Sequence, residues 1–259
     1  MELLPKTRLE KASDRVQTPD FVRHVTLPVT EGQWPRGAAL EKYARLSRPH
    51  KALQERIAVL SDTAIVLDFE TTGLDADEGH RVTEIAALRV RGDRVVGRFE
   101  SLVNSGARIP GYIAKFTGIT QTMIDNAPDA ARVFRQLLAF IGTDKVIAHN
   151  AWFDEGFLAR ECERLGLPNS VPEFVCSVRI ARRLFPELKN HALGSLASRL
   201  GMPFMPGAHC AGVDASVTAS IVLRMCELLR ARLATPGVDV ATLHRFATSA
   251  DVDPIATAA

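Results

Sequence analysis

The chain has 259 residues, a formal net charge of +2, and 46% hydrophobic and 24% charged residues. The length allows one sizeable core plus further segments, and the composition is ordinary for a globular protein. The near-neutral charge excludes an overall field that attracts polyanions, and no stretch has the roughly 20 apolar residues of a membrane span.

The sequence shows neither an export signal nor a pattern of paired cysteines. The first residues lack the apolar core of a secretory signal. The widely spaced cysteines form no C-x-x-C pair, which favours reduced thiols. They are Cys162, Cys176, Cys210 and Cys226. We therefore expect a cytoplasmic protein with no membrane partner.

Residues 1–60 carry five prolines and more Lys and Arg than Asp and Glu. Short helical patterns are possible over Ala38–Ser47 and Lys51–Leu60, and the second has apolar residues on one face. We expect a basic extension that packs on the body of the protein. An arm that contacts a partner or a substrate is the alternative.

Residues 61–234 form the predicted body. The expected strands cover Ala64–Phe69, Arg81–Arg91, Arg94–Asn104, Lys145–His149 and Phe174–Ser177. Short helices are expected around Phe116–Thr120, and longer ones over Asp129–Ile141, Phe153–Leu165, Val178–Phe185, Leu193–Leu200 and Val213–Leu233. This order predicts a mixed α/β sheet of five strands, a three-strand meander and then parallel strands, flanked by helices. The apolar pattern is lost after Pro236, so residues 235–259 are expected to be a loosely ordered tail.

Two acidic residues mark the end of the first strand. Asp68 interrupts an apolar segment and Glu70 lies two residues later, so both side chains point to one face. Two like charges this close repel unless a cation lies between them, and hard carboxylate oxygens suit Mg²⁺ or Mn²⁺ rather than Zn²⁺. Taken alone, the pair is weak evidence, because surface Asp-x-Glu pairs are common.

Two further segments carry candidate residues. His149–Asp154 follows the fourth strand and places Asp154 where a helix begins, although N-capping alone could explain it. His209–Ala215 leads into the last long helix, with Asp214 near the helix start, where the helix dipole stabilises an anion. A surface or capping role is the alternative for His209. All three segments lie at element ends, where the carboxyl edge of an α/β sheet assembles ligand sites.

Together the three segments resemble the DEDDh exonuclease family, typified by the proofreading epsilon subunit of bacterial DNA polymerase III. The matching residues are Asp68–Gly73, His149–Asp154 and His209-x-Ala-x-x-Asp214-Ala215, supported by Glu84–Ala87, Thr117–Thr120 and His191–Leu193. The resemblance spans about Ala64 to Leu229. Phe69, where the epsilon subunit has Thr, is a departure at a side chain expected to face away from the metals. The resemblance implies a ribonuclease H-like fold.

The same resemblance implies a two-metal hydrolase. Asp68, Glu70 and Asp214 would hold one Mg²⁺ or Mn²⁺ ion, and Asp68 would bridge to a second ion, about 4 Å away, held by Asp154. His209 would take the proton from the attacking water, since its usual pKa of about 6.5 suits a general base near neutral pH.

Further residues are expected to contact the substrate. They are Thr71, Thr72, Gly73 and Leu74 after the first strand, and His149, Asn150 and Phe153 after the fourth. Ordinary packing is the alternative for Leu74 and Phe153. A basic cluster could meet phosphates or form a solvated helix face. Its members are Arg179, Arg182, Arg183 and Lys189.

The expected function is hydrolysis of phosphodiester bonds from the 3′ end of DNA, freestanding or beside a DNA polymerase subunit. A 3′–5′ exoribonuclease with the same residues is the rival. A non-catalytic nucleic-acid-binding module is a further alternative, which the intact set of four acids and one His disfavours. Because we find no convincing clamp-binding peptide or long C-terminal polymerase-binding segment, we expect a freestanding or auxiliary enzyme.

Overall fold

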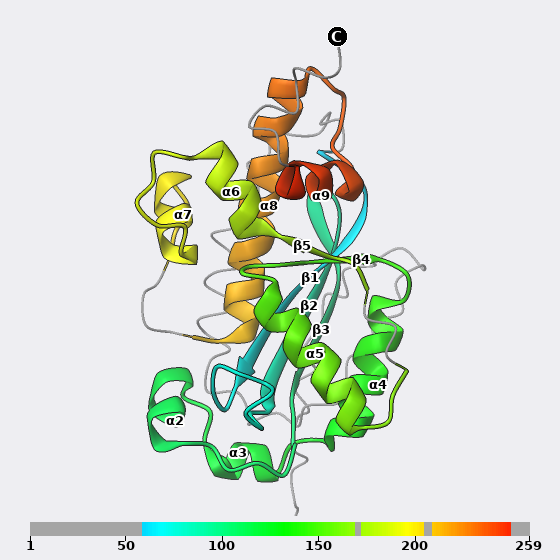
Figure 1. Ribbon diagram of the computed structural model, residues 1–259, viewed down its shortest axis with the longest axis vertical. Helices are drawn as coiled ribbons and strands as arrows, with labels where there is room; N and C mark the ends of the chain where they lie inside the picture. Colours follow the sequence, from blue (N-terminus) through cyan, green and yellow to red (C-terminus); the bar gives the residue numbers. More distant parts are fainter. Residues whose placement is uncertain (1–58, 169–171, 205–208, 250–259) are drawn as a thin grey trace, which may run out of the picture.

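The computed structural model describes residues 59–168, 172–204 and 209–249. Its centre is a five-stranded sheet in the order β3-β2-β1-β4-β5 (Figure 1). The strands are β1 (Leu60–Thr71), β2 (Val82–Gly92), β3 (Arg94–Leu102), β4 (Lys145–Ala148) and β5 (Phe174–Cys176). The first three form an antiparallel meander, and β4 and β5 run parallel to β1. The predicted mixed sheet is confirmed, with β1 longer at both ends than predicted.

Helices cover both faces of this sheet (Figure 1). One face carries α4 (Ala130–Ile141) and α5 (Trp152–Arg164). The other carries α6 (Ser177–Leu184), α7 (Leu193–Arg199) and α8 (Ala211–Leu233). All five agree with the predicted helices to within two residues at either end. The short α2 (Gly111–Thr117) and α3 (Gln121–Asp125) lie beyond the carboxyl end of β1.

Successive side chains of β1 point alternately to the two layers of helices. Ile65 and Leu67 belong to the core under α4 and α5, whereas Ala64 and Val66 belong to the core under α8. Asp68 continues the second series, so the strand carries this acid towards the α8 layer.

The segment after Pro236 differs from the prediction. It forms a further helix, α9 (Val240–Thr248), which packs against α6, β5 and β1. Its buried side chains are Val240, Leu243, Phe246 and Ala247. The expectation of a loosely ordered tail is therefore wrong for this part of residues 235–259. A helix this short has little intrinsic stability, and its packing on the core stabilises it.

The predicted extension at residues 1–60 lies outside the described residues, apart from Val59 and Leu60. Leu60 begins β1 rather than ending the helix expected over Lys51–Leu60. Residues 250–259 also lie outside. Within the described ranges, no helix is long and apolar enough to cross a membrane.

Candidate functional site

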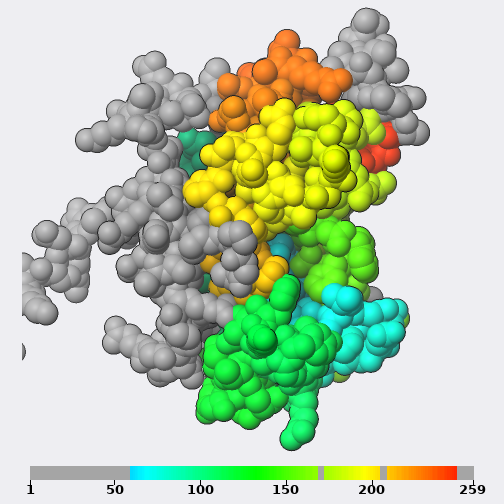
Figure 2. All heavy atoms as spheres, turned by 90° about the vertical axis from the view of Figure 1, so that its left-hand side faces the viewer, coloured from blue at the N-terminus to red at the C-terminus, as the bar shows by residue number. Residues whose placement is uncertain are grey.

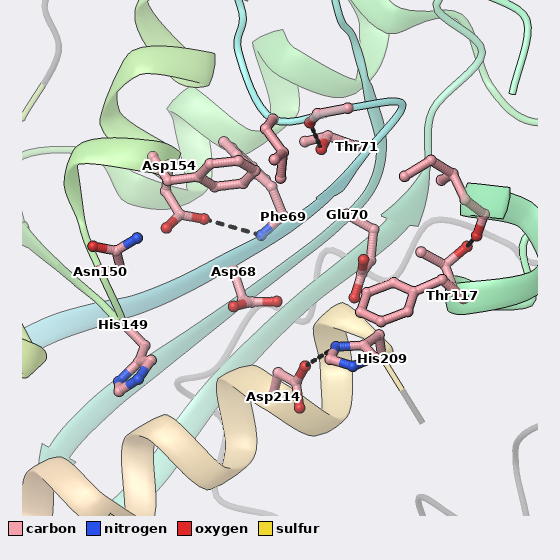
Figure 3. A pocket seen from close by; sticks show the side chains of 15 residues that line it. Asp68, Phe69, Glu70, Thr71, Thr117, His149, Asn150, Asp154, His209 and Asp214 are labelled. Atoms are coloured by element: carbon pink, nitrogen blue, oxygen red, sulfur yellow. Dashed lines mark hydrogen bonds and ion pairs between the residues drawn. The ribbon is translucent and has the colours of Figure 1, made fainter. Parts of the chain in front are cut away.

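The end of β1 carries two acidic side chains. Asp68 lies opposite Ala86 of β2, and Glu70 lies opposite Glu84. Asp68 is half-buried and Glu70 is buried. Both carboxylates point into the same space, as their spacing along the strand predicts (Figure 3).

Asp154 reaches this space from α5. After β4 the chain turns through Asn150, whose φ of 69° is a left-handed conformation that Asn tolerates. Asp154 then falls in the first turn of α5, where its side chain is 2% exposed. Its Oδ1 accepts a hydrogen bond from the backbone N of Phe69 at 3.1 Å. The N-capping interpretation is therefore wrong, because Asp154 lies inside the helix and ties α5 to β1.

A third element, α8, contributes Asp214 from its first turn. Glu84 of β2, only 1% exposed, accepts a hydrogen bond from the backbone N of Ala211 at 3.0 Å. The first N–H groups of a helix have no partner within the helix and favour such an anion, so Glu84 anchors the end of α8 that carries Asp214. We predict no role for Glu84 from the sequence. Glu84 is nevertheless an acid inside an apolar strand, which is the same signal that indicated Asp68.

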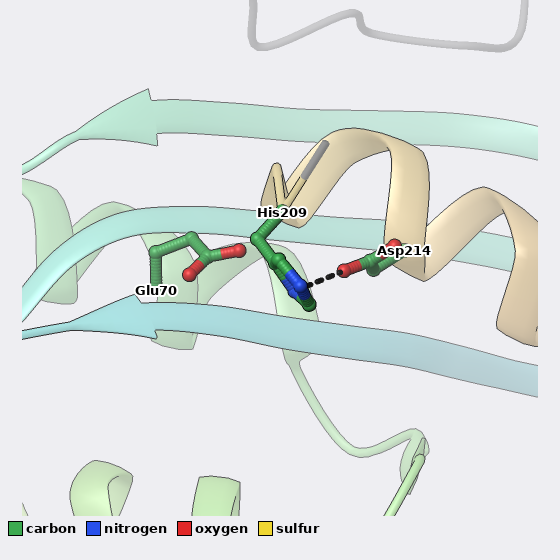
Figure 4. A group of neighbouring side chains, drawn as sticks. All are labelled: Glu70, His209 and Asp214. Carbon is green, nitrogen blue, oxygen red and sulfur yellow. Dashed lines mark ion pairs between the residues drawn. The ribbon is translucent and has the colours of Figure 1, made fainter. Parts of the chain in front are cut away.

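His209 lies one residue before the N-cap of α8. Its Nδ1 is 3.8 Å from Oδ2 of Asp214, and the ligand atoms of Glu70, His209 and Asp214 lie within 4.8 Å of one another (Figure 4). The phenyl ring of Phe116 stacks on the imidazole, with centroids 3.8 Å apart and planes inclined by 18°. No sequence signal indicates this contact, because it joins α2 to a residue about ninety positions later.

These side chains line one cavity at the carboxyl edge of β1 and β4. Its lining includes Asp68, Phe69, Glu70, Thr71, Gly73, Leu74, Ile113, Phe116, Thr117, His149, Asn150, Phe153, Asp154, His209 and Asp214. Figure 2 shows a hollow there, bordered by α2 in green and by the cyan loop that follows β1. The structure thus brings together every predicted site residue except Thr72.

Thr72, Leu74 and Phe153 are all predicted to contact the substrate, but they have different surroundings. The Thr72 hydroxyl lies 3.3 Å from Nδ1 of His80, away from the cavity. Leu74 is 79% exposed, so ordinary packing does not explain it. Phe153 lines the cavity and also packs on Phe157, with ring centroids 4.8 Å apart.

Burial and mutual repulsion raise the pKa values of the cavity acids. Burial, followed by the charges of Asp154 and Asp214, raises the pKa of Asp68 well above its usual value. Burial raises the pKa of Asp154 to about 8, and burial together with the charge of Glu84 raises the pKa of Asp214 to about 7. The carboxylates are therefore costly to ionise without a compensating cation.

A divalent cation fits this donor set. Among the described residues that line the cavity, none is Lys or Arg. The carboxylates of Asp68, Glu70, Asp154 and Asp214 supply hard oxygen atoms of the kind that Mg²⁺ and Mn²⁺ prefer. A bound cation would offset the charge repulsion that contributes to the raised pKa values of Asp68 and Asp214, so these four residues could hold it.

The histidines of the cavity are neutral bases. Burial lowers the pKa of His209, and it lowers the pKa of His149 to about 4. Nδ1 of His149 lies 3.0 Å from the hydroxyl of Ser177, the first residue of α6. The His149 ring points away from the carboxylates in Figure 3, whereas His209 lies beside Asp214.

The predicted basic cluster divides into two groups, with three arginines on α6 and an exposed Lys189 beyond its end. Arg183 donates a hydrogen bond to the carbonyl of Ser249 at 2.6 Å and lies over the ring of Phe246, so it holds α9. Arg179 and Arg182 are exposed. The cluster therefore cannot act as a whole on phosphates.

Comparisons with known proteins match the region that contains the cavity. Residues 65–222 match the family model RNase_T, described as exonuclease. The chain is 33% identical over 179 residues to DNA polymerase III subunit epsilon of Aquifex aeolicus, which covers 69% of this chain and 88% of that protein. It is 35% identical over 166 residues to the PolC-type DNA polymerase III of Bacillus cereus, which covers 64% of this chain but only 11% of that protein.

A solved structure has the same fold. The nuclease domain of 3'hExo, a DEDDh family member bound to rAMP, superimposes with a TM-score of 0.56 at 20% identity. The match covers 64% of this chain and 92% of that chain. At this identity the likeness shows the shared ribonuclease H-like architecture.

Proposed function

The chain belongs to the RNase_T family of exonucleases, as a hydrolase of the DEDDh type, and we propose that it removes nucleotides from the 3′ end of DNA. The two relatives are DNA polymerase III proteins, which supports DNA as the substrate. The same names support a DNA polymerase subunit as a partner. The match to 88% of the epsilon subunit supports assigning the activity to the region around the cavity.

One observation carries this proposal: four carboxylates and the imidazole of His209 converge in a cavity whose described lining has no Lys or Arg. Asp68, Glu70 and Asp214 would hold one Mg²⁺ or Mn²⁺ ion, and Asp68 and Asp154 a second. When bound, the two ions would activate the attacking water and stabilise the departing 3′ oxygen.

His209 would accept the proton of the attacking water. Because burial lowers its pKa, the imidazole is neutral near pH 7 and able to take up a proton. Asp214, at 3.8 Å, would then stabilise the imidazolium that forms. The side chain of His209 is partly exposed, so the proton can pass on to solvent.

The walls of the cavity would orient the end of the strand. Leu74 and Phe153 would pack against the terminal bases, a contact that any base can make. Backbone groups of Thr71 and Gly73 and the amide of Asn150 would meet the sugar and phosphate. His149 lines the cavity next to α6, and from this position it would contact the 3′ end of the strand.

Oligonucleotides labelled at the 5′ end test the proposal. With Mg²⁺ or Mn²⁺, we expect single-stranded DNA to give a ladder of shortened, labelled products, whereas digestion from the 5′ end would release the label at once as a mononucleotide. EDTA should stop the reaction and added Mg²⁺ should restore it.

Matched substrates and metals identify the alternatives. Faster digestion of RNA than of DNA of the same sequence would assign an exoribonuclease instead. Rescue of the EDTA-treated protein by Zn²⁺ alone would contradict the assignment of hard oxygen ligands. Binding of the strand with no hydrolysis under any of these conditions would indicate a non-catalytic module.

A further inference from the structure

Large apolar side chains are exposed at few places in the described ranges, and two of them, Leu74 and Phe116, line the cavity. The set is Leu74, Val95, Tyr112, Phe116 and Trp152. Phe116 is 54% exposed, yet its ring makes a specific contact, because it lies nearly flat on the imidazole of His209. A ring that served only as apolar surface would not require this geometry.

The backbone around Phe116 is held firmly. The hydroxyl of the next residue, Thr117, donates to the carbonyl of Ile113 at 3.0 Å and accepts from the backbone N of Ile119 at 3.1 Å. Gly118 ends α2 with a φ of 72°, the left-handed conformation that glycine adopts without strain. Ile119 is buried in a small core with Ile124. The phenyl ring therefore projects from a fixed position.

The other side of the stack is His209, which comes just before α8. His209 precedes Cys210, the N-cap of α8, so it lies outside the helix. The 3.8 Å between Nδ1 of His209 and Oδ2 of Asp214 exceeds the length of a hydrogen bond, so this pair is an electrostatic contact. A parallel stack at 3.8 Å fixes the plane of the imidazole.

We infer that Phe116 is a positioning residue, which keeps the imidazole of His209 in the plane that faces Asp214 and Glu70. The inference rests on the proposed function, in which His209 accepts the proton of the attacking water. Phe116 acts through His209, so its loss should slow the chemical step. A phenyl ring that instead packed on a nucleobase would act mainly on substrate binding.

The kinetic test uses the full-length protein with Mg²⁺ and thymidine 5′-(4-nitrophenyl phosphate), a small phosphodiester. We expect Phe116→Leu to lower kcat by about 10²-fold with little change in KM, the usual effect of a misplaced catalytic group. Phe116→Tyr keeps an aromatic ring and should restore most of the activity. Tyr112→Leu removes an exposed aromatic one helical turn away and should leave kcat unchanged.

A double variant separates positioning from substrate contact. In a His209→Ala background, Phe116→Leu should cause no further loss, because residues that act as a unit are not additive. Additive losses would overturn the inference. A rise in KM with kcat unchanged would also overturn it and would assign Phe116 to nucleotide binding.

The NMR signal of the His209 Hε1 proton distinguishes this inference from the proposed function. In the metal-free protein, the ring current of the stacked phenyl should shift this signal upfield, and Phe116→Leu should abolish the shift. An unchanged signal would refute the stack. Wild-type protein that does not hydrolyse the phosphodiester, or His209→Ala as active as wild type, would instead refute the proposed function while the shift remained.

Discussion

The two ends of β1 carry acidic side chains that the fold treats in opposite ways. At the amino end, Asp62 and Asp239 accept hydrogen bonds from backbone N–H groups in the first turn of α9, at 2.6 to 3.2 Å. Glu173 nearby pairs with Lys145 at 2.9 Å. At the carboxyl end, the acids of the cavity face one another, and no Lys or Arg occurs among its described lining residues.

The pKa values record this difference. Hydrogen bonds from Thr242 and Lys145 lower the pKa values of Asp239 and Glu173, respectively. Burial raises the pKa of Asp154 to about 8. Burial alone is not the distinction, because it also raises the pKa of Asp62, whose bond to α9 acts against it. The acids at one end hold a helix, whereas those at the other end are placed to hold a ligand.

Asp68→Ala should produce the largest effect. We expect it to abolish hydrolysis while the protein stays folded, because it removes a metal ligand and relieves repulsion among the cavity acids. The melting temperature of the metal-free protein should rise, by about 2–4 °C for each kcal/mol of repulsion relieved. Activity assays and thermal melts in EDTA measure both effects.

Asp62→Ala is the matched control, since it removes an acid from the other end of the same strand. It should keep the activity and lower the melting temperature, because Val240 loses its hydrogen-bond acceptor. An active Asp68→Ala protein would remove Asp68 from the proposed metal site. An Asp68→Ala protein that melts below wild type in EDTA would refute the repulsion argument.

Local geometry explains what the sequence could predict. The two-residue period of a strand places Asp68 and Glu70 on one face, and the start positions of α5 and α8 bring Asp154 and Asp214 to the same edge of the sheet. These arguments need only element types and the rule that parallel strands end at a common edge. The order of strands and helices in the body follows from the same patterns.

Tertiary contacts explain what the sequence could not predict. The buried residues of α9 recur at helical spacing, but only nine residues carry the pattern, and a helix this short depends on its packing against α6 and β5. The stack of Phe116 on His209 depends on the position of α2 relative to α8. Glu84 gains its role from the end of a helix more than a hundred residues away. The contacts of Phe116 and Glu84 have no periodic signature in the sequence.

The dependence of stability on pH should sharpen the comparison. In the folded, metal-free protein, Asp154 and Asp214 have pKa values of about 8 and about 7, against 3.8 in the unfolded chain. The folded state therefore binds more protons between about pH 4 and pH 8, and its stability should fall as the pH rises through this window. Asp239 and Glu173 have lowered pKa values, so their contribution is lost only at lower pH.

Thermal melts at pH 5.5 and pH 8 in EDTA measure this effect, and the melting temperature should be lower at pH 8. Excess Mg²⁺ should cancel the difference, because cation binding favours the ionised carboxylates. Asp154→Asn should weaken the pH dependence. A metal-free protein equally stable at both pH values would indicate that the cavity acids are already ionised.

Asp239→Ala should have the smallest effect, and it tests the amino end of β1 alone. The variant loses the N-cap that accepts from the backbone N of Thr242, which costs about 1 kcal/mol of the free energy of unfolding. Urea unfolding measures this loss, and Asp239→Asn, which keeps an acceptor, is the matched control. Since α9 packs at the end of the sheet away from the cavity, kcat with Mg²⁺ should not change. If the variant is fully folded and its kcat still falls, the two ends of β1 are coupled. The contacts that hold α9 would then also affect the site that holds the ligand.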